Sequence, residues 1–377
     1  MSWKVESIMS QRVQFYDLWN QGKVNITELC KQFGISRKTG YKWLKRAKEG
    51  GKDWFLDGSR KPHSSPMKTA TKLESKIVNL RNKYPDWGGR KLKKLLQNKG
   101  EKNTPSASTI TAILKRHNLI DKNKVSNQAT LRFEHESPND LWQMDFKGHF
   151  QMSRGRCHPL TILDDHSRYN ITLKACHRET RLEVKNSMIE AFERYGIPER
   201  MTMDNGSPWG HKANGYTKLT VWLMDIGIRV SHSRPYHPQT QGKDERFHRT
   251  LKLEVLRRND FRNLADCQKA FDNWSELYNN VRPHEALDME VPATKYRVSK
   301  RQYQGSSLEY EYDHEDIIRK VNRSGTISLK NQKCFLGEAF AGRPVAIKRT
   351  INSGIFDVYY RHQKIYKINL RKQLEME

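Results

Sequence analysis

The segment Arg234–Lys252 reads RPYHPQTQGKDERFHRTLK and changes character in its middle. Its first half has two prolines, a glycine and no apolar periodicity, which is typical of a loop. From Lys243 onward the pattern predicts a helix whose apolar stripe, Phe247, Leu251 and Val255, faces a core.

The first turn of this predicted helix carries an acidic pair, Asp244-Glu245, in a basic neighbourhood. Residues i, i+4 and i+7 share one face of a helix, so Glu245 lies on the same face as Arg249 and Lys252. Ordinary i, i+4 pairing on a solvated face would also explain this arrangement. Asp244 is turned about 100° from Glu245 and is the weaker candidate for the same surface.

Two more acids are marked by their positions. Asp145 lies in a strand-like run, WQMDFKG, and Asp204 closes another, MTMDNGS, 59 residues later and 41 residues before Glu245. Two carboxylates at strand ends and one on a helix can meet at the carboxyl edge of a sheet. Three bare carboxylates would repel one another, so we expect one or two divalent cations, Mg²⁺ or Mn²⁺, among these oxygen ligands. Two such ions about 4 Å apart align an in-line phosphoryl displacement.

The composition indicates a polyanionic partner. The 377 residues include 69 Lys and Arg against 42 Asp and Glu, a formal net charge of +27, and nucleic acid is the natural counterpart of such a charge. Anionic membrane is the rival partner, but no apolar run of about 18 residues is present. The N-terminus lacks the apolar core of a signal peptide, so we expect a cytoplasmic, nucleoid-associated protein. Five scattered cysteines without a CxxC pair favour reduced, buried or half-buried thiols.

The N-terminal third predicts two small basic helical domains. In 1–50, a short helix capped by Thr27, a glycine turn at Gly34 and a helix cap at Ser36 precede a basic helix, which is the helix-turn-helix plan. A helical bundle with a solvated basic face is the alternative. A linker, 51–68, leads to a second helix-turn-helix or winged-helix-like domain at 69–120, with helix caps at Thr71 and Ser106, and a linker at 121–137 follows. The candidate DNA contacts in these domains are Arg37, Lys38, Lys42, Lys45, Arg46, Arg90, Lys91 and Lys94.

The composition changes at Pro138. Residues 138–297 alternate strand-like and helical patterns, which predicts a mixed-sheet α/β domain with trailing helices. Within it, Asp164 and Asp165 of DDHSR are expected to form a turn. Residues 310–377 show short strands separated by turn signals and predict a small basic β-barrel that helps to bind DNA; a barrel that serves only as scaffold is the alternative.

Three motifs give the sequence a family resemblance. WQMDFKG, TMDNGSPW and PYHPQTQGKDERFHRTLK resemble the DDE motifs of the retroviral-integrase superfamily, and most closely those of bacterial insertion-sequence transposases of the IS481 and IS3 type. YNNVRPHEALDMEVPATKY, 278–296, resembles the segment that follows their catalytic helix. The spacing from Asp204 to Glu245 is longer than is usual there, which a polar insertion at 211–218 accounts for. The zinc-binding domain of retroviral integrases is absent from the sequence.

The resemblance implies an RNase H-like core in which Asp145, Asp204 and Glu245 are the catalytic residues and metal ligands. It implies a DNA transposase that binds terminal inverted repeats, cuts 3′ ends and transfers the strands into target DNA, as a homodimer or higher homo-oligomer. Bases at positions matching Arg249 and Lys252 contact DNA ends in the integrases. The other candidate DNA contacts near the site are His237, Gln241 and Lys243.

Two other functions fit parts of the sequence. A regulator derived from a transposase would share the basic domains without cutting, although the intact acidic triad argues against it. A nuclease of the RNase H fold acting on RNA–DNA hybrids would not need two helix-turn-helix domains.

Overall fold

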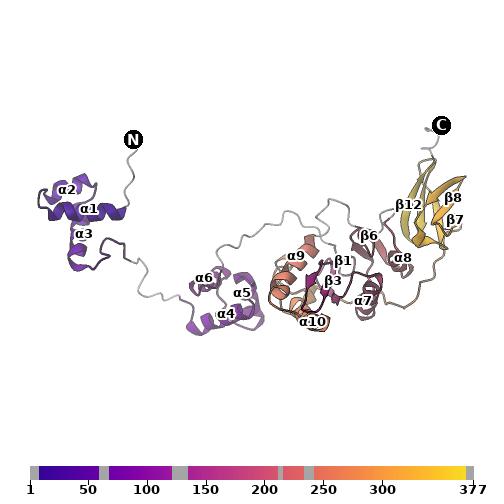
Figure 1. Ribbon diagram of the computed structural model, residues 1–377, viewed down its shortest axis with the longest axis horizontal. Helices are drawn as coiled ribbons and strands as arrows, with labels where there is room; N and C mark the ends of the chain where they lie inside the picture. The colour runs from indigo at the N-terminus through magenta and orange to yellow at the C-terminus, as the bar shows by residue number, and fades with distance from the viewer. Residues whose placement is uncertain (1–7, 59–67, 121–134, 211–214, 233–241, 371–377) are drawn as a thin grey trace. The chain divides into compact units, whose positions relative to one another are not determined.

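The computed structural model describes residues 8–58, 68–120, 135–210, 215–232 and 242–370, in two compact units divided after Lys68. Unit 1 holds three helices, α1 (Ile8–Asn20), α2 (Ile26–Gln32) and α3 (Arg37–Glu49) (Figure 1). Gly34 has φ +61° and makes the turn between α2 and α3, a backbone conformation that glycine adopts readily. Ser36 caps α3 by accepting a hydrogen bond from the Thr39 amide. The helix-turn-helix order predicted for this part of the chain is confirmed.

Unit 2 begins with the second helical domain, formed by α4 (Thr71–Lys83), α5 (Gly89–Asn98) and α6 (Ala107–Arg116). Its core is built from the apolar stripes of the three helices, which include Ile77, Leu92 and Ile110. Gly89 allows α5 to approach α6, because a Cβ there would lie 2.4 Å from the Ala107 carbonyl oxygen.

A mixed sheet forms the centre of unit 2. Its strands are β1 (Trp142–Phe146), β2 (Phe150–Gln151), β3 (Arg156–Asp164), β4 (Asn170–Cys176), β5 (Arg200–Met203) and β6 (Arg229–His232). β2, β3, β1, β5 and β6 follow one another across the sheet, and β4 pairs with β3. β1 runs antiparallel to β3 but parallel to β5, and β5 runs parallel to β6. The predicted mixed sheet of an integrase-like core is therefore present.

Helices cover both faces of this sheet. One face packs against α7 (Arg181–Tyr195) and α8 (Lys218–Asp225). The other packs against α9 (Gly242–Leu251), its π-helical continuation η2 (Lys252–Leu256) and α10 (Leu264–Asn280). Two short helices, η3 (Glu285–Leu287) and α11 (Pro292–Lys295), follow. The predicted apolar stripe Phe247, Leu251 and Val255 is buried on the second face.

All five cysteines are buried, as their scattered positions suggested. The Cys157 and Cys267 sulfurs lie 3.6 Å apart between β3 and α10. Within the described ranges, none of the helices combines the length and the apolar character that a membrane crossing requires.

The C-terminal strands do not form the predicted closed barrel. β7 (Ile317–Lys320), β10 (Pro344–Arg349), β11 (Ile355–Tyr360) and β12 (Gln363–Asn369) form one antiparallel sheet in the order β12-β11-β10-β7. β8 (Thr326–Leu329) and β9 (Gln332–Phe335) form a separate hairpin, followed by the 3₁₀ turn η4 (Glu338–Phe340). In the described residues, β7 and β12 stay at opposite edges of their sheet, and closure would require those edges to be paired.

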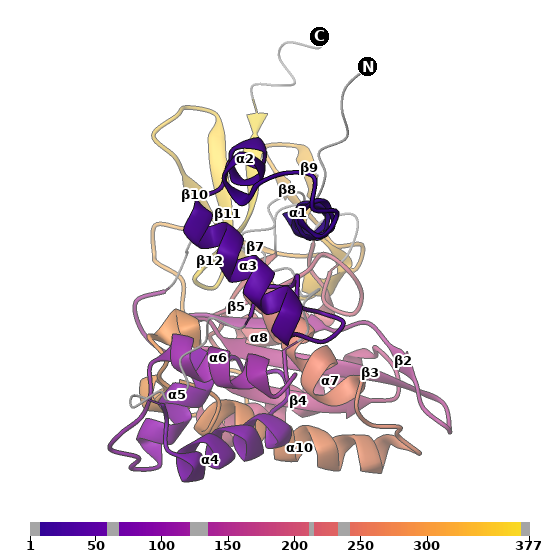
Figure 2. The same cartoon turned by 90° about the vertical axis from the view of Figure 1, so that its left-hand side faces the viewer.

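The C-terminal sheet packs on the core beside α8 and β6 (Figures 1 and 2). The buried carboxylate of Asp225 forms ion pairs with Arg343, at 2.8 Å, and Arg361, and accepts a hydrogen bond from the Tyr360 hydroxyl. The Gln363 side chain bonds both the amide and the carbonyl of Val230, each at 2.7 Å. These contacts cover the exposed edge of β6, which would otherwise be open to another strand.

Candidate active site

Asp145 and Asp204 come together because β1 and β5 are parallel neighbours. Gln143 of β1 pairs with Thr202 of β5, and two residues beyond each of them stand Asp145 and Asp204. Burial and then the charge of Asp204 raise the pKa of Asp145 to about 7. The two carboxylates therefore lie close enough for the charge of Asp204 to disfavour ionisation of Asp145.

The Asp204 carboxylate is held by its own loop. Its Oδ1 accepts hydrogen bonds from the Gly206 amide, at 2.9 Å, and from the Trp209 indole. Trp209 is buried and stacks on Phe146, with ring centroids 5.3 Å apart. Sequence reasoning did not single out Trp209, although TMDNGSPW contains it; only the fold shows that it orients an acid.

The two acids at the start of α9 differ in environment. Glu245 is exposed, whereas Asp244 is buried and its Oδ1 has no hydrogen-bond partner among the residues that the structure describes. Burial and then the charge of Asp145 raise the pKa of Asp244 well above its usual value. The helix geometry predicts that the Asp244 side chain points away from that of Glu245. In the structure the Asp244 side chain points into the protein, where the charge of Asp145 acts on it. Across the described ranges, no three His, Cys, Asp or Glu side chains are close enough together to hold a metal ion.

His248, one turn after Glu245, also reaches this edge of the sheet. Its Nε2 lies 2.9 Å from the Thr161 hydroxyl, and its Nδ1 lies 3.9 Å from Asp145 Oδ2. Burial and then the charge of Lys147 lower the pKa of His248 to about 4, so the imidazole is neutral at pH 7. Sequence reasoning missed this residue, and the only signal for it was its helical spacing from Glu245.

The carboxylates of Asp145 and Asp204 fit a divalent cation, because oxygen ligands suit Mg²⁺ and Mn²⁺. A bound cation would also relieve the repulsion that raises the pKa of Asp145. Asp145 and Asp204 are placed to supply such ligands. The segment 233–241 lies outside the described residues, and with it the predicted DNA contacts His237 and Gln241.

Comparisons with known proteins identify the domains to which parts of the chain are similar. The integrase core domain family matches residues 135–238 and, in a second form, 226–292, and the C-terminal domain of IS481 family transposases matches 316–376. A helix-turn-helix domain matches 11–63 and a homeodomain-like domain matches 39–114. These matches support an IS481-type DDE transposase.

Relatives of the transposase come from other insertion elements. A 31.7 kDa protein of insertion element IS407 from Burkholderia multivorans is 24% identical over 289 residues, which are 74% of this chain and 94% of that protein. A 39.2 kDa protein of IS476 from Xanthomonas euvesicatoria is 25% identical over 170 residues, 45% of this chain and 47% of that protein. The chain thus spans about half the length of the IS476 protein. The HTLV-2 integrase catalytic core domain, solved in complex with magnesium, aligns over 43% of this chain and 99% of its own at 17% identity, with a TM-score of 0.35.

The predicted DNA contacts of α3 lie largely on its solvent side. Four of them, Arg37, Lys38, Lys42 and Lys45, are exposed, and the buried face of α3 consists of Gly40, Trp43 and Leu44. Arg46 is half-buried, with its guanidinium carbon 4.9 Å from the Trp43 ring centroid. In the second helical domain Arg90 is exposed. On α9 and its continuation η2, Arg249 and Lys252 are exposed.

Three other predicted DNA contacts interact with charged groups of the protein itself. Lys243 forms an ion pair with the buried Asp165 at 2.5 Å, which fixes the start of α9. Lys94 forms an ion pair with Glu290 at 2.5 Å, and Lys91 is half-buried near Arg282. Burial and then the charge of Arg282 lower the pKa of Lys91 to about 8. Contacts of these three side chains with DNA remain predictions.

Proposed function

We propose that this transposase binds the terminal inverted repeats of its insertion sequence, cuts the 3′ ends and transfers them into target DNA. The observation that carries the proposal is the parallel register of β1 and β5, which brings Asp145 and Asp204 to one sheet edge beside the helix that bears Glu245. Two acids on adjacent strands and one on a covering helix suit metal-assisted displacement at phosphorus.

In this proposal Asp145, Asp204 and Glu245 hold Mg²⁺ or Mn²⁺, as two ions per site. The bound metal supplies Lewis acidity and alignment, first for water and then for the 3′-hydroxyl. Asp204 is oriented for this role by the Gly206 amide and the Trp209 indole. Glu245 is exposed at the start of α9 and joins the other two acids when the metal and DNA are bound.

The positive surface would hold the DNA around this centre. The exposed cations of α3, with Arg90, would contact the terminal repeat, and Arg249 and Lys252 would contact the cut end next to Glu245. Because two ends must be cut and joined together, we expect a homodimer or higher assembly that forms on DNA.

The test is Mg²⁺-dependent cleavage of a labelled duplex bearing the repeat that flanks the coding frame. Asp145→Asn, Asp204→Asn and Glu245→Gln should abolish cleavage and strand transfer while end binding is retained. Asp244→Asn is the matched control on the same helical turn, and it should still cut because the amide mimics the protonated carboxyl. Strand joining by Asp145→Asn in Mg²⁺ would refute the assignment, and loss of cutting in Asp244→Asn but not in Glu245→Gln would make Asp244 the ligand.

A regulator that binds DNA without cutting it is the second candidate. The exposure of Glu245 and the absence of a three-ligand cluster among the described residues favour it. The same assay decides, because a regulator would bind the repeat and leave it intact at every Mg²⁺ concentration.

A further inference from the structure

A buried polar clamp joins the second helical domain to the helix that carries Glu245. We propose that this clamp, made by residues 84–87 and Glu254, fixes which phosphodiester bond of a bound DNA end is cut. The inference rests on the proposed function, and it adds a positioning role for residues that lie outside the acidic site.

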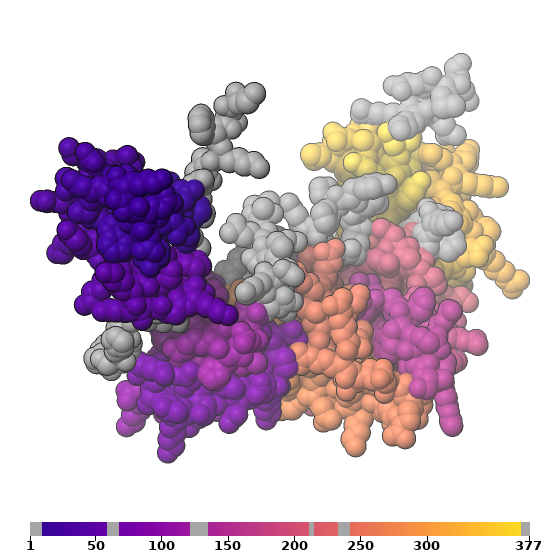
Figure 3. All heavy atoms as spheres, turned by 60° about the vertical axis from the view of Figure 1, so that its left-hand side comes forward, coloured from indigo at the N-terminus to yellow at the C-terminus, as the bar shows by residue number. Residues whose placement is uncertain are grey.

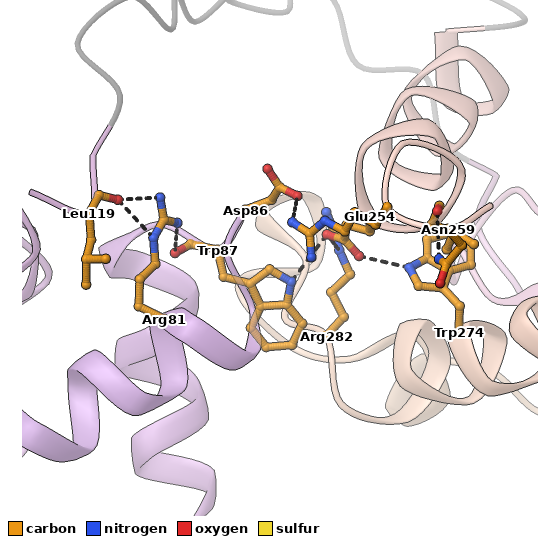
Figure 4. A network of polar contacts seen from close by, with 10 residues as sticks. Arg81, Asp86, Trp87, Leu119, Glu254, Asn259, Trp274 and Arg282 are labelled. Atoms are coloured by element: carbon orange, nitrogen blue, oxygen red, sulfur yellow. Dashed lines mark hydrogen bonds and ion pairs between the residues drawn. The ribbon is translucent and has the colours of Figure 1, made fainter.

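Glu254 is the centre of the clamp (Figure 4). Its Oε1 accepts hydrogen bonds from the Trp87 indole at 3.2 Å and from Arg282 Nε at 3.1 Å. Its Oε2 accepts one from the Trp274 indole at 2.9 Å. The Glu254 side chain is 7% exposed and that of Arg282 is 9% exposed. Water therefore has little access to replace a donor that leaves, which makes the contact with Trp87 costly to break.

Two ion pairs and an apolar patch fix the domain at other points. Asp86, next to Trp87, pairs with Arg258, and Lys94 of α5 pairs with Glu290. Leu277 and Val281 of the core pack against the apolar cluster of α4–α6. A body held at several separate points cannot pivot about any one of them. Figure 3 shows the two parts in contact, α4–α6 in purple and α9–α10 in orange.

The domain side of the clamp is itself rigid. Arg81 of α4 donates to the Trp87 carbonyl at 2.8 Å and to the Leu119 carbonyl from two of its nitrogens, as Figure 4 shows. The Trp87 ring stacks on Tyr84 with ring centroids 4.2 Å apart. The position of the Trp87 indole is therefore set by α4 and by the segment after α6, so a shift of the domain would move the indole away from Glu254.

The core side of the clamp leads directly to the active site. Glu254 and Glu245 belong to one continuous helical segment, α9 followed by η2, and the nine steps between them span about 13 Å at the usual rise. Phe247, Leu251 and Val255 bury this segment along its length. DNA held by α4–α6 is thereby placed at a set distance from Glu245. A flexible tether would raise the local concentration of DNA without setting that distance.

The position of the cut tests the clamp. In the full-length protein, Asp86→Lys places two cations together at the Arg258 contact, and Asp86→Lys with Arg258→Glu restores an ion pair of reversed sign. The wild type should cut mainly at one bond of a labelled end. Asp86→Lys should lose preference for that bond about fivefold, as expected for modest coupling between two sites, with end affinity unchanged, and the double variant should regain the preference.

A matched pair of tryptophan variants separates the clamp from general damage. Trp87→Phe removes the interdomain donor to Glu254, whereas Trp274→Phe removes a donor from within the core. Only the first should spread the cuts over neighbouring bonds. Cuts at an unchanged bond in both Asp86→Lys and Trp87→Phe would overturn the proposal.

Hydrogen exchange of the DNA-free protein gives a readout that does not depend on cutting. Asp86→Lys should speed exchange in peptides covering α5 and residues 278–291 and leave α7 unchanged. Equal exchange in wild type and variant would refute the clamp. Two results together would separate the proposals: faster exchange in Asp86→Lys, and no cleavage of end DNA by the wild type. They would support the clamp but refute both the proposed function and the role of the clamp in cut position.

Discussion

Glu254→Gln should strongly destabilise the larger unit. The carboxylate receives three donors and faces the Arg282 guanidinium. A glutamine offers one acceptor oxygen and turns an NH₂ group toward at least one of those donors. It also leaves the buried cation of Arg282 without its counter-charge.

The magnitude follows from burial. Breaking a buried ion pair by removing one partner costs about 3–5 kcal/mol. At about 2 °C per kcal/mol for a unit of this size, the melting temperature should fall by roughly 6–10 °C. Glu290→Gln is the matched control, because the Glu290 side chain is 39% exposed in its pair with Lys94, and such pairs contribute about 0–1 kcal/mol.

Scanning calorimetry of the full-length protein would measure the effect, since the transition of the larger unit can be followed separately from that of residues 1–68. A Glu254→Gln transition within about 2 °C of both the wild type and the Glu290→Gln control would contradict the reasoning. It would mean that Glu254 is solvated and its three donors are satisfied elsewhere.

Three further substitutions test other parts of the structure. Lys91→Met should stabilise the larger unit at pH 7 by on the order of 2 kcal/mol. The pKa of Lys91 in the folded protein, about 8, lies below its ordinary value of 10.5. The wild type should therefore gain stability as the pH rises from 8 to 10.5, whereas the variant should not. Calorimetry over that pH range checks this, and a parallel rise in both proteins would contradict it. Asp225→Ala should release the C-terminal sheet by leaving Arg343 and Arg361 without their carboxylate, so limited proteolysis should cut first within 297–316; an unchanged cleavage pattern would argue against this. Lys252→Glu should weaken binding of the terminal repeat more than binding of unrelated duplex in a competition titration, and an equal loss for both would count against a contact at the cut end.

Local chemistry made several parts of the fold predictable from the sequence. Ser36 and Ser106 cap α3 and α6 as expected, because an N-cap depends on neighbouring residues alone. The caps predicted at Thr27 and Thr71 are wrong: Asn25 caps α2, and Thr71 is the first residue of α4. The DDHSR turn follows from Asp164, whose Oδ1 accepts hydrogen bonds from the amide and hydroxyl of Ser167. The buried stripe of α9 was legible from its helical period.

Long-range contacts were beyond the reach of local patterns. The sequence predicts Lys91 and Lys94 as exposed cations, because no residue pattern within their own helix indicates that α5 packs against the core. Trp87 and Glu254 are 167 residues apart, so their hydrogen bond has no local signature. The prediction of a closed barrel was wrong for the same reason. Short strands and turns predict β structure, but closure depends on which distant edge strands pair.

At the candidate active site, the sequence predicted which acids lie near one another, but it did not predict the burial and the contacts of their side chains. The adjacency of Asp145 and Asp204 follows from strand ends in a parallel pair, and the sequence indicated those ends. The burial of Asp244 and the indole of Trp209 on Asp204 depend on how α9 and the loop after β5 pack. These features appear only once the chain is folded.

The π-helical turn at Lys252–Leu256 sets the angle around the helix axis between Glu245 of α9 and Glu254. A π turn accommodates one residue more than an α turn. Deleting Lys252 would let this segment close into an α turn. Glu245 and the residues after Leu256 would keep their places, whereas Glu254 would move back by one position, about 100° around the helix. Glu254 would then swing away from Trp87 with the acidic site untouched. Under the proposed function, a deletion of this one codon would separate the position of the cut from the ability to cut, and a screen that scores activity alone would miss it.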